Sequence, residues 1–184
     1  MIGFTTGRET NQRLNSLLKD LTHVVPRSQI IRRGKSNREE LAFRLYKNGF
    51  THAIGIFRLH GGPGRIELFT INANGMSSLP PCALLKSVKL GREYPRRAKC
   101  IATAVTHKAD LPDEILRFCH ALSSALELPE VAIQQTSQIR ASFHITDLPD
   151  RTIQLSVTSP AARHEVGPTL SISRLLWDEN EAGR

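Results

Sequence analysis

Leucines at a helical spacing dominate the start of the chain. They recur at positions i, i+3, i+4 and i+7, the repeat of one face of an α-helix, and they are Leu14, Leu17, Leu18 and Leu21. We therefore expect a helix from about Thr10 to Thr22. Short apolar runs on either side, Ile2–Thr6 and Ser28–Arg32, predict two strands.

A second helix is predicted to begin near Ser36, because Ser36 and Glu39 have the spacing of a capping box. Gly49 is typical of the residue that follows a helix C-terminus. The inner face of this helix is expected to carry Leu41, Leu45 and Tyr46.

Two runs rich in Ile, Leu and Phe follow, Ala53–Leu59 and Arg65–Ile71. The glycines and proline at 61–64 separate them, which predicts neighbouring strands around a tight turn. A phosphate-binding P-loop is the alternative for these glycines, but the Lys-Ser/Thr pair of that motif is missing. The order strand, helix, strand, helix, strand, strand indicates an α/β layer arrangement.

The stretch from Asn72 to Pro81 carries Gly, Ser, Asn and paired prolines, so we expect a connection between two halves of the protein there. Beyond it, Ala83–Leu90 and Cys100–Val105 are predicted strands on either side of a basic loop. Asp110 is a candidate cap for a helix that runs to about Glu127. Its buried face is expected to carry Ile115, Phe118, Cys119, Leu122 and Leu126.

The C-terminal part alternates apolar and polar residues, most clearly from Gln138 to Thr146, which predicts a sheet with one face toward water. Ile153–Val157 repeats the pattern and Leu170–Leu176 supplies a last strand. The sequence thus predicts an α/β fold in one domain spanning 1–184, built of two packed halves, 1–75 and 80–184, each a mixed β-sheet flanked by helices. No repeat is legible residue by residue, so an internal duplication remains open.

The charge distribution indicates a binding function, because the net charge of +8 is distributed unevenly along the chain. Residues 1–99 hold 18 Lys and Arg against 6 Asp and Glu, a net +12, whereas the remainder holds 7 against 11, a net −4. A basic half joined to a mildly acidic half indicates one positive face, as expected for a protein that binds a polyanion. The alternative is an ordinary solvated surface.

Two basic clusters are the candidate nucleic-acid-binding sites. The first surrounds Gly34, whose backbone allows close approach of a ligand, at the start of a helix whose amides favour an anion; it comprises Arg27, Arg32, Arg33, Lys35 and Arg38. The second brackets Tyr94, a ring suited to stacking on a base, and comprises Lys86, Lys89, Arg92, Arg96, Arg97 and Lys99.

Other chemistry has little support. The cysteines Cys82, Cys100 and Cys119 lack CxxC spacing, the histidines never form HxH or HExxH, and no GxSxG is present, so we expect no catalytic residue, no metal and no cofactor. No apolar run approaches the roughly 20 residues of a membrane span, and the N-terminus does not have the layout of a signal peptide. We therefore expect a cytoplasmic protein without a membrane partner or a small-molecule substrate.

Short motifs in a defined order span nearly the whole chain. They are Thr5-Thr6-Gly7-Arg8, Val25-Pro26, Arg32-Arg33-Gly34-Lys35, Phe50-Thr51-His52-Ala53-Ile54, His60-Gly61-Gly62-Pro63 and Glu165-Val166-Gly167-Pro168. Together they resemble the landmarks of the Brix-domain family, in particular its compact archaeal members. Two places depart from the family pattern: the usual Thr-Ser-Arg opening reads Thr5-Thr6-Gly7-Arg8, and the expected Gly-Pro after the hairpin is replaced at 72–76.

The resemblance implies a role in ribosome biogenesis through binding ribosomal RNA precursors or guide RNA, with ribosome-assembly proteins as further expected partners. It also implies two halves similar to the anticodon-binding domains of class II aminoacyl-tRNA synthetases. In the family, the stretch matching 32–35 and the helix after it form a sigma-factor-like motif thought to contact RNA. The expected RNA-binding residues are Arg8, Arg32, Arg33, Gly34, Lys35, Arg38, Arg92, Arg96, Arg97 and Lys99. A protein-interaction scaffold and an RNA-modifying enzyme are the alternatives.

Overall fold

The computed structural model describes residues 1–59, 62–94, 100–133, 139, 141–159 and 164–178. The helices are α1 (Gln12–Val24), α2 (Arg38–Lys47) and α3 (Asp113–Leu126), with a 3-10 helix η1 at Gly91–Glu93. The strands are β1 (Ile2–Thr6), β2 (Ser28–Ile30), β3 (His52–Leu59), β4 (Gly62–Asn72), β5 (Gly75–Lys89), β6 (Ala104–His107), β7 (Glu130–Ala132), β8 (Ser142–Asp147), β9 (Ile153–Ser159) and β10 (His164–Leu176). None of the helices formed by these residues has the length and apolar composition of a membrane span. The predicted α/β fold is confirmed.

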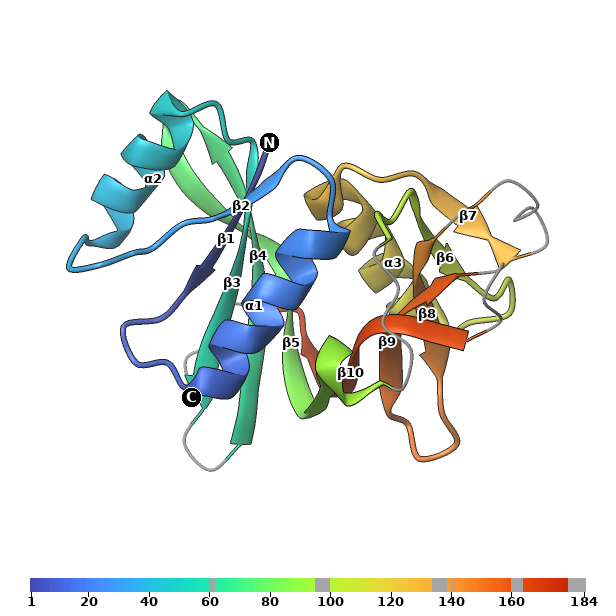
Figure 1. The fold of residues 1–184 in the computed structure, drawn as a ribbon. Helices are drawn as coiled ribbons and strands as arrows, with labels where there is room; N and C mark the ends of the chain where they lie inside the picture. The colour runs from blue at the N-terminus through green and yellow to red at the C-terminus, as the bar shows by residue number, and fades with distance from the viewer. Residues whose placement is uncertain (60–61, 95–99, 134–138, 140, 160–163, 179–184) are drawn as a thin grey trace.

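The strands form one mixed ten-stranded sheet in the order β2-β1-β3-β4-β5-β10-β9-β8-β6-β7 (Figure 1). The two predicted halves are therefore joined edge to edge. β5 and β10 run antiparallel, with Cys82 opposite Leu176 and Lys89 opposite Thr169. Because this seam pairs backbone groups of both halves, it leaves neither half with an open inner edge.

The two halves repeat one connectivity. In the first, β1 pairs in parallel with β2 and β3, and β3, β4 and β5 continue antiparallel. In the second, β6 pairs in parallel with β7 and β8, and β8, β9 and β10 continue antiparallel. Helices α1 and α3 occupy corresponding places, between the first and second strand of each set. The duplication that the sequence left open is thus visible in the topology.

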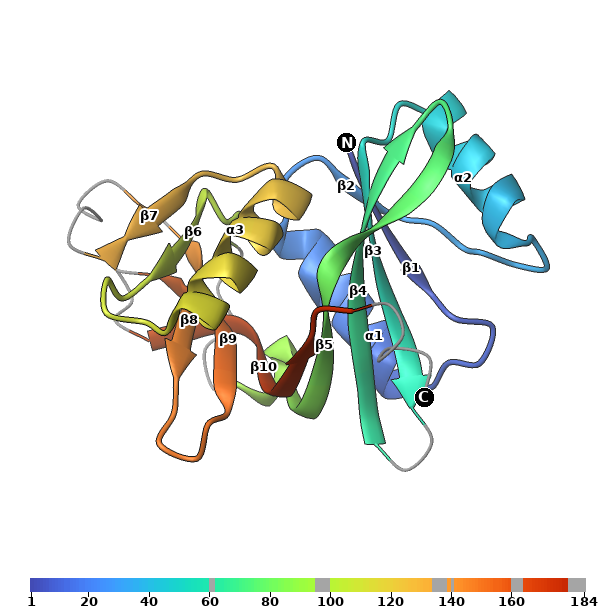
Figure 2. The ribbon, with the colours of Figure 1, turned by 180° about the vertical axis from the view of Figure 1, so that it is seen from behind.

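Helices α1 and α3 share one core with the sheet (Figures 1 and 2). All four leucines that predicted α1 are buried, and Leu17 is completely inaccessible. The five predicted inner residues of α3 are also buried. Helix α1 contacts β10 of the other half, and α3 contacts β3, β4 and β5. The halves therefore bury apolar surface against each other as well as against their own helices.

Helix α2 covers the other face of the first half, over a smaller core of its own. That core contains Leu41, Leu45, Phe50, Ala53, Phe69 and Ile71. The predicted cap was one residue off. Asn37 Oδ1 accepts the N–H of Glu40 at 2.8 Å and the Glu40 carboxylate accepts the N–H of Asn37 at 3.1 Å. Tyr46, predicted on the inner face, is 46% exposed instead.

Some predicted elements were wrong. The expected connection at 72–81 is strand, because Ala73 and Asn74 alone make the turn and β5 begins at Gly75, whose φ is +123°. The prolines at 80–81 lie where the β4–β5 register shifts, a place that tolerates residues without an N–H. Helix α3 begins at Asp113 after Pro112, without the side-chain cap expected from Asp110.

The tight turn predicted at 61–64 corresponds to an antiparallel hairpin in which Leu59 pairs with Gly62, although its tip at 60–61 lies outside the described residues. Gly64 has a φ of +129°, and a Cβ there would lie 2.6 Å from the carbonyl oxygen of Phe57. Glycine is therefore required at this position for both reasons.

Part of the face that was predicted to be exposed to water in the C-terminal sheet is buried. Ser142 and Thr106 are buried, and their hydroxyls lie 2.9 Å apart. Thr106 Oγ1 also lies 3.1 Å from Nδ1 of His144, and burial lowers the pKa of that imidazole. Ser142 and His144 thus bond to Thr106 of the neighbouring strand β6, whereas Gln138 and Arg140 of the predicted alternation lie outside the described residues.

One carboxylate joins the halves at the end of α3. Glu127 pairs with Arg27 at 2.7 Å and with the amino group of Met1 at 3.6 Å, and it accepts a hydrogen bond from Thr51. His52 Nδ1 lies 3.4 Å away. The Thr51 hydroxyl, the terminal ammonium and the Arg27 guanidinium lower the pKa of Glu127 to about 2.

Candidate nucleic-acid interface

The loop between β2 and α2 holds the first predicted cluster. The N–H of Ile31 bonds the carbonyl of Phe4 at 2.7 Å, which ties the start of the loop to β1. The chain then turns at Gly34, which has a φ of +62°. Ser36 N–H bonds the carbonyl of Arg33, and Arg33 Nε donates back to the carbonyl of Ser36 at 3.2 Å. The loop therefore has a defined backbone, closed by its own hydrogen bonds.

The charges of this loop face solvent without acidic partners. Arg32 and Lys35 are exposed and Arg33 is half-buried. Within the described part of the chain, no carboxylate forms an ion pair with any of the three. The Glu40 carboxylate, a possible partner in the sequence, is bonded to the backbone of Asn37. The loop therefore presents positive charge that a polyanion can neutralise.

Arg38, the first residue of α2, lies where three hollows meet. Its Nη2 donates to the carbonyl of Met76 at 3.3 Å, and its guanidinium lies 5.5 Å from the centre of the Phe69 ring. These contacts fix the arginine between α2 and the β4–β5 hairpin. Because the donors of a guanidinium are rigidly arranged, the remaining ones are pre-oriented for a phosphate or another anion.

The first hollow, of about 160 Å³, lies between the cationic loop and the end of β1. Arg33, Arg38, Thr5 and Thr6 line it together. Thr5 is buried, and its hydroxyl has no hydrogen-bond partner among the described residues. These guanidiniums and hydroxyls can donate hydrogen bonds to phosphate oxygens. The Glu67 carboxylate also lines the hollow and is paired with Arg65 at 2.7 Å.

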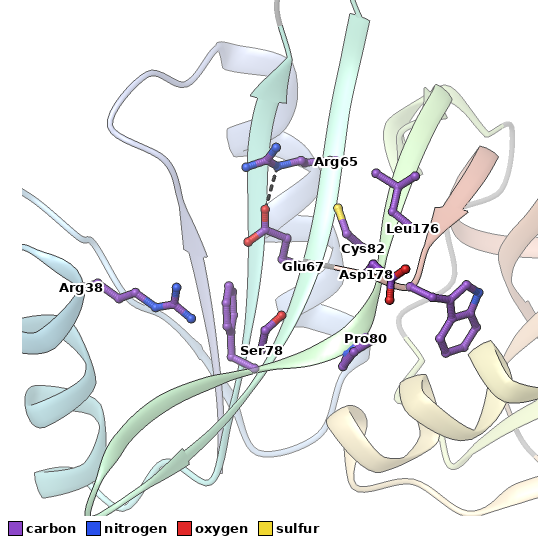
Figure 3. Close-up of a pocket in the computed structure, with 10 residues that line it drawn as sticks. Arg38, Arg65, Glu67, Ser78, Pro80, Cys82, Leu176 and Asp178 are labelled. Carbon is purple, nitrogen blue, oxygen red and sulfur yellow. Dashed lines mark ion pairs between the residues drawn. The ribbon is translucent and has the colours of Figure 1, made fainter. Parts of the chain in front are cut away.

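The second hollow, of about 250 Å³, extends from Arg38 toward the seam between the halves (Figure 3). Arg65 and Glu67 lie along it as an ion pair of 2.7 Å. Cys82 lines the same space, but burial raises the pKa of its thiol to about 11. A thiol in this state is a poor nucleophile, because the thiolate is the reactive form.

The second predicted cluster is only partly available. Lys86 pairs with Asp150 at 2.7 Å, and the Lys89 ammonium lies 4.0 Å from the centre of the Tyr94 ring. Tyr94 also donates its hydroxyl to Thr169 at 2.5 Å, and burial raises its pKa to about 12. The ring is therefore anchored by its hydroxyl and is not free to reorient for stacking on a base.

Arg92 is exposed on η1, whereas Arg96, Arg97 and Lys99 lie outside the described residues. Helix η1 is bonded to α1: Gly91 N–H donates to Asp20 at 2.8 Å, and Arg13 pairs with Glu93 at 2.9 Å. Helix η1 thus lies beside α1, whereas the loop at 32–38 leads into α2, which covers the opposite face of the sheet.

The other predicted cations have different surroundings. Arg8 is exposed two residues after Thr6, so it lies close to the hollow that Arg33 lines. Arg27, by contrast, is committed to its ion pair with Glu127. No group of three or more His, Cys, Asp or Glu among the described residues is arranged to hold a metal ion.

Sequence reasoning missed four residues of α2: Phe43, Arg44, Tyr46 and Lys47. Phe43 is 64% exposed, and Arg44 Nη2 donates to the carbonyl of Arg32 at 2.8 Å. The available signal was the helical repeat, which places Phe43 about half a turn from Leu41. An aromatic residue opposite the buried face, between cations, indicates an exposed contact surface.

The chain thus forms a ten-stranded sheet of two similar α/β halves, with a cationic loop before α2 that pairs with no carboxylate of the described residues. Solved structures share this fold. A probable ribosomal biogenesis protein from Aeropyrum pernix K1 has a TM-score of 0.75 and 22% identity, over 93% of this chain and 94% of that one.

Mil, an archaeal Imp4-like protein, has a TM-score of 0.67 and 17% identity, over 97% of this chain and all of that one (100%). No family model and no curated protein sequence matches the chain. The fold expected from the sequence landmarks is confirmed, because both solved structures share it over nearly the whole chain.

Proposed function

We propose that this protein is a non-catalytic RNA-binding factor of ribosome assembly that binds ribosomal RNA precursor or guide RNA in the cytoplasm. The observation that carries the proposal is the loop at 32–38, whose cations lie at the start of a helix and pair with no carboxylate of the described residues. The fold supports it, because it is shared with a probable ribosomal biogenesis protein and an Imp4-like protein.

In this proposal Arg32, Arg33, Lys35 and Arg38 neutralise phosphates, and Gly34 lets the backbone approach them. Arg33 and Arg38 hold one phosphate over the hollow that Thr5 lines. Arg8 and Arg92 extend the contact along the RNA, with Arg96, Arg97 and Lys99 as further predicted contacts. Ribosome-assembly proteins are expected to bind elsewhere on the surface.

The dependence of affinity on salt tests the proposal. If about five cations neutralise phosphates on single-stranded RNA, the logarithm of affinity falls against the logarithm of salt with a slope of about −3.5. Changing Arg33→Ala together with Lys35→Ala is expected to flatten that slope by roughly 1 to 1.5. The measurement is binding to a ribosomal RNA fragment at several salt concentrations.

A matched control removes two exposed cations elsewhere, Lys19→Ala on α1 with Lys108→Ala after β6. Both double variants lose the same charge, so a general effect of net charge weakens them equally. An effect confined to the Arg33 and Lys35 variant supports the loop as the site. An unchanged slope and affinity in that variant refutes it, and a parent protein without affinity for RNA refutes the function itself.

A further inference from the structure

The outer face of α2 carries two exposed aromatic rings. Phe43 and Tyr46 are 64% and 46% exposed, and they are the only aromatic residues among the large exposed hydrophobics in the described part of the chain. Three residues apart on a helix, they lie on the same side. Exposed rings cost solvation free energy, so a pair on one helix face indicates contact with a ligand.

The rings form one wall of the third hollow that meets at Arg38. This hollow, of about 300 Å³, lies between α2 and the turn of the β4–β5 hairpin. Its volume is at the lower end of the range for small-molecule pockets, about 300 to 1,000 Å³. The opposite wall includes Asn72, Asn74 and Met76.

Polar groups that recognise base edges lie on that opposite wall. The Asn72 Oδ1 accepts the N–H of Asn74 at 2.9 Å, which fixes the turn and leaves the Asn72 amide nitrogen as a donor. Side-chain amides carry both donors and acceptors, the combination that the edges of nucleobases complement. A purely apolar partner would leave these groups without hydrogen bonds.

Charge around the hollow favours a polyanion. Residues 32–47 hold six Lys and Arg against Glu39 and Glu40, and Glu40 is bonded to the helix cap. The Lys47 ammonium lies 5.4 Å from the centre of the Phe43 ring. Aromatic rings next to a cationic surface are typical of proteins that bind single-stranded RNA, in which bases stack on the rings while cations follow the backbone.

We propose that this hollow binds an unpaired nucleobase of single-stranded RNA, stacked on Phe43 and Tyr46, while the loop at 32–38 holds the adjacent phosphates. The inference rests on the proposed function and adds that the RNA is unpaired at this point. A duplex is excluded from the hollow because its bases are already stacked on one another.

The test compares three probes: a short single-stranded RNA, the duplex that it forms with its complement, and the same single strand with abasic sites. Changing Phe43→Ala together with Tyr46→Ala is expected to weaken binding of the single strand by about 5- to 150-fold, as for loss of one stacked base. The salt slope is expected to stay unchanged, because no phosphate contact is removed. Affinity for the duplex should also stay unchanged, and the abasic strand should bind the parent about as weakly as the intact strand binds the variant.

Two controls separate stacking from other effects. Phe43→Tyr with Tyr46→Phe keeps both rings and is expected to bind like the parent. Leu148→Ala, at an exposed apolar residue of the β8–β9 turn, removes apolar surface elsewhere. All the substituted residues are exposed, so the variants are expected to fold, which thermal melts check.

The possible failures are distinguishable. In one outcome, Phe43→Ala with Tyr46→Ala binds the single strand like the parent, while Arg33→Ala with Lys35→Ala binds it weakly. The base-binding inference is then overturned and the proposed function stands. A protein partner then becomes the occupant of the aromatic face. Equal losses for single strand and duplex also overturn the inference. A parent that binds none of the three probes refutes the proposed function, and the inference with it.

Discussion

Replacing Glu127 with glutamine tests the contact that joins the end of α3 to the N-terminal strands. Glutamine keeps an oxygen that accepts the Thr51 hydroxyl, but it removes the charge that attracts Arg27 and the amino group of Met1. The variant therefore isolates the electrostatic part of this contact.

The magnitude follows from the lowered pKa. Each pKa unit corresponds to about 1.36 kcal/mol, so the fall from 4.5 to about 2 sets an upper limit of about 3 kcal/mol. The side chain of Glu127 is 25% exposed and that of Arg27 is 74% exposed, so water screens the attraction between their charges. Exposed ion pairs contribute about 0 to 1 kcal/mol, and we expect a loss of about 1 kcal/mol, which lowers Tm by roughly 2 to 4 °C.

The effect should depend on pH with a defined sign. Because folding lowers the pKa, the charge of Glu127 stabilises the native state above its ordinary, unfolded pKa of 4.5. This contribution disappears as the pH falls toward the folded value of about 2. The difference in unfolding free energy between parent and Glu127→Gln should therefore be full at pH 7 and less than half as large at pH 3.

Urea unfolding at both pH values measures this difference. Glu9→Gln, at an exposed carboxylate in the β1–α1 loop, is the matched control and should change stability by less than about 0.5 kcal/mol. A loss that is equal at pH 7 and pH 3 would refute the electrostatic reasoning and assign the effect to packing.

Three further predictions concern stability. Leu17→Ala removes a completely buried side chain and should cost about 2 to 5 kcal/mol by urea unfolding; a variant that unfolds like the parent would mean that α1 is not packed as described. Gly64→Ala should destabilise by more than about 1 kcal/mol, since a Cβ meets the carbonyl of Phe57 at a positive φ; a stabilised variant would contradict this geometry. Asn37→Ala should cost about 0.5 to 2 kcal/mol and Ser36→Ala almost nothing in thermal melts, because Asn37 caps α2; the reverse order would restore Ser36 as the cap.

The sequence by itself determined the elements whose signal is local. The burial of α1 and α3 could be predicted because leucines and other apolar residues at a helical repeat have to share one face, whatever that face packs against. The position of the cationic loop could also be predicted, since Gly34 permits the turn. Among the described residues, no carboxylate far away in the chain forms an ion pair with Arg33 or Lys35. Helix boundaries were predicted less well, as Asn37 and Ser36 are both good caps and only the geometry of the turn selects one.

Other features depend on residues far apart in the chain, so only the tertiary structure decided them. The seam between β5 and β10 joins segments with no shared local pattern. The expected connection at 72–81 is strand because residues 75–79 pair with β4. Long-range contacts also distinguish cations that look equivalent in sequence. Arg27 forms an ion pair with Glu127, which is 100 residues away in the chain, whereas Arg33 pairs with no carboxylate among the described residues. The outward position of Tyr46 has the same origin, because the helical repeat defines which residues share a face, while the sheet beneath α2 decides which face is buried.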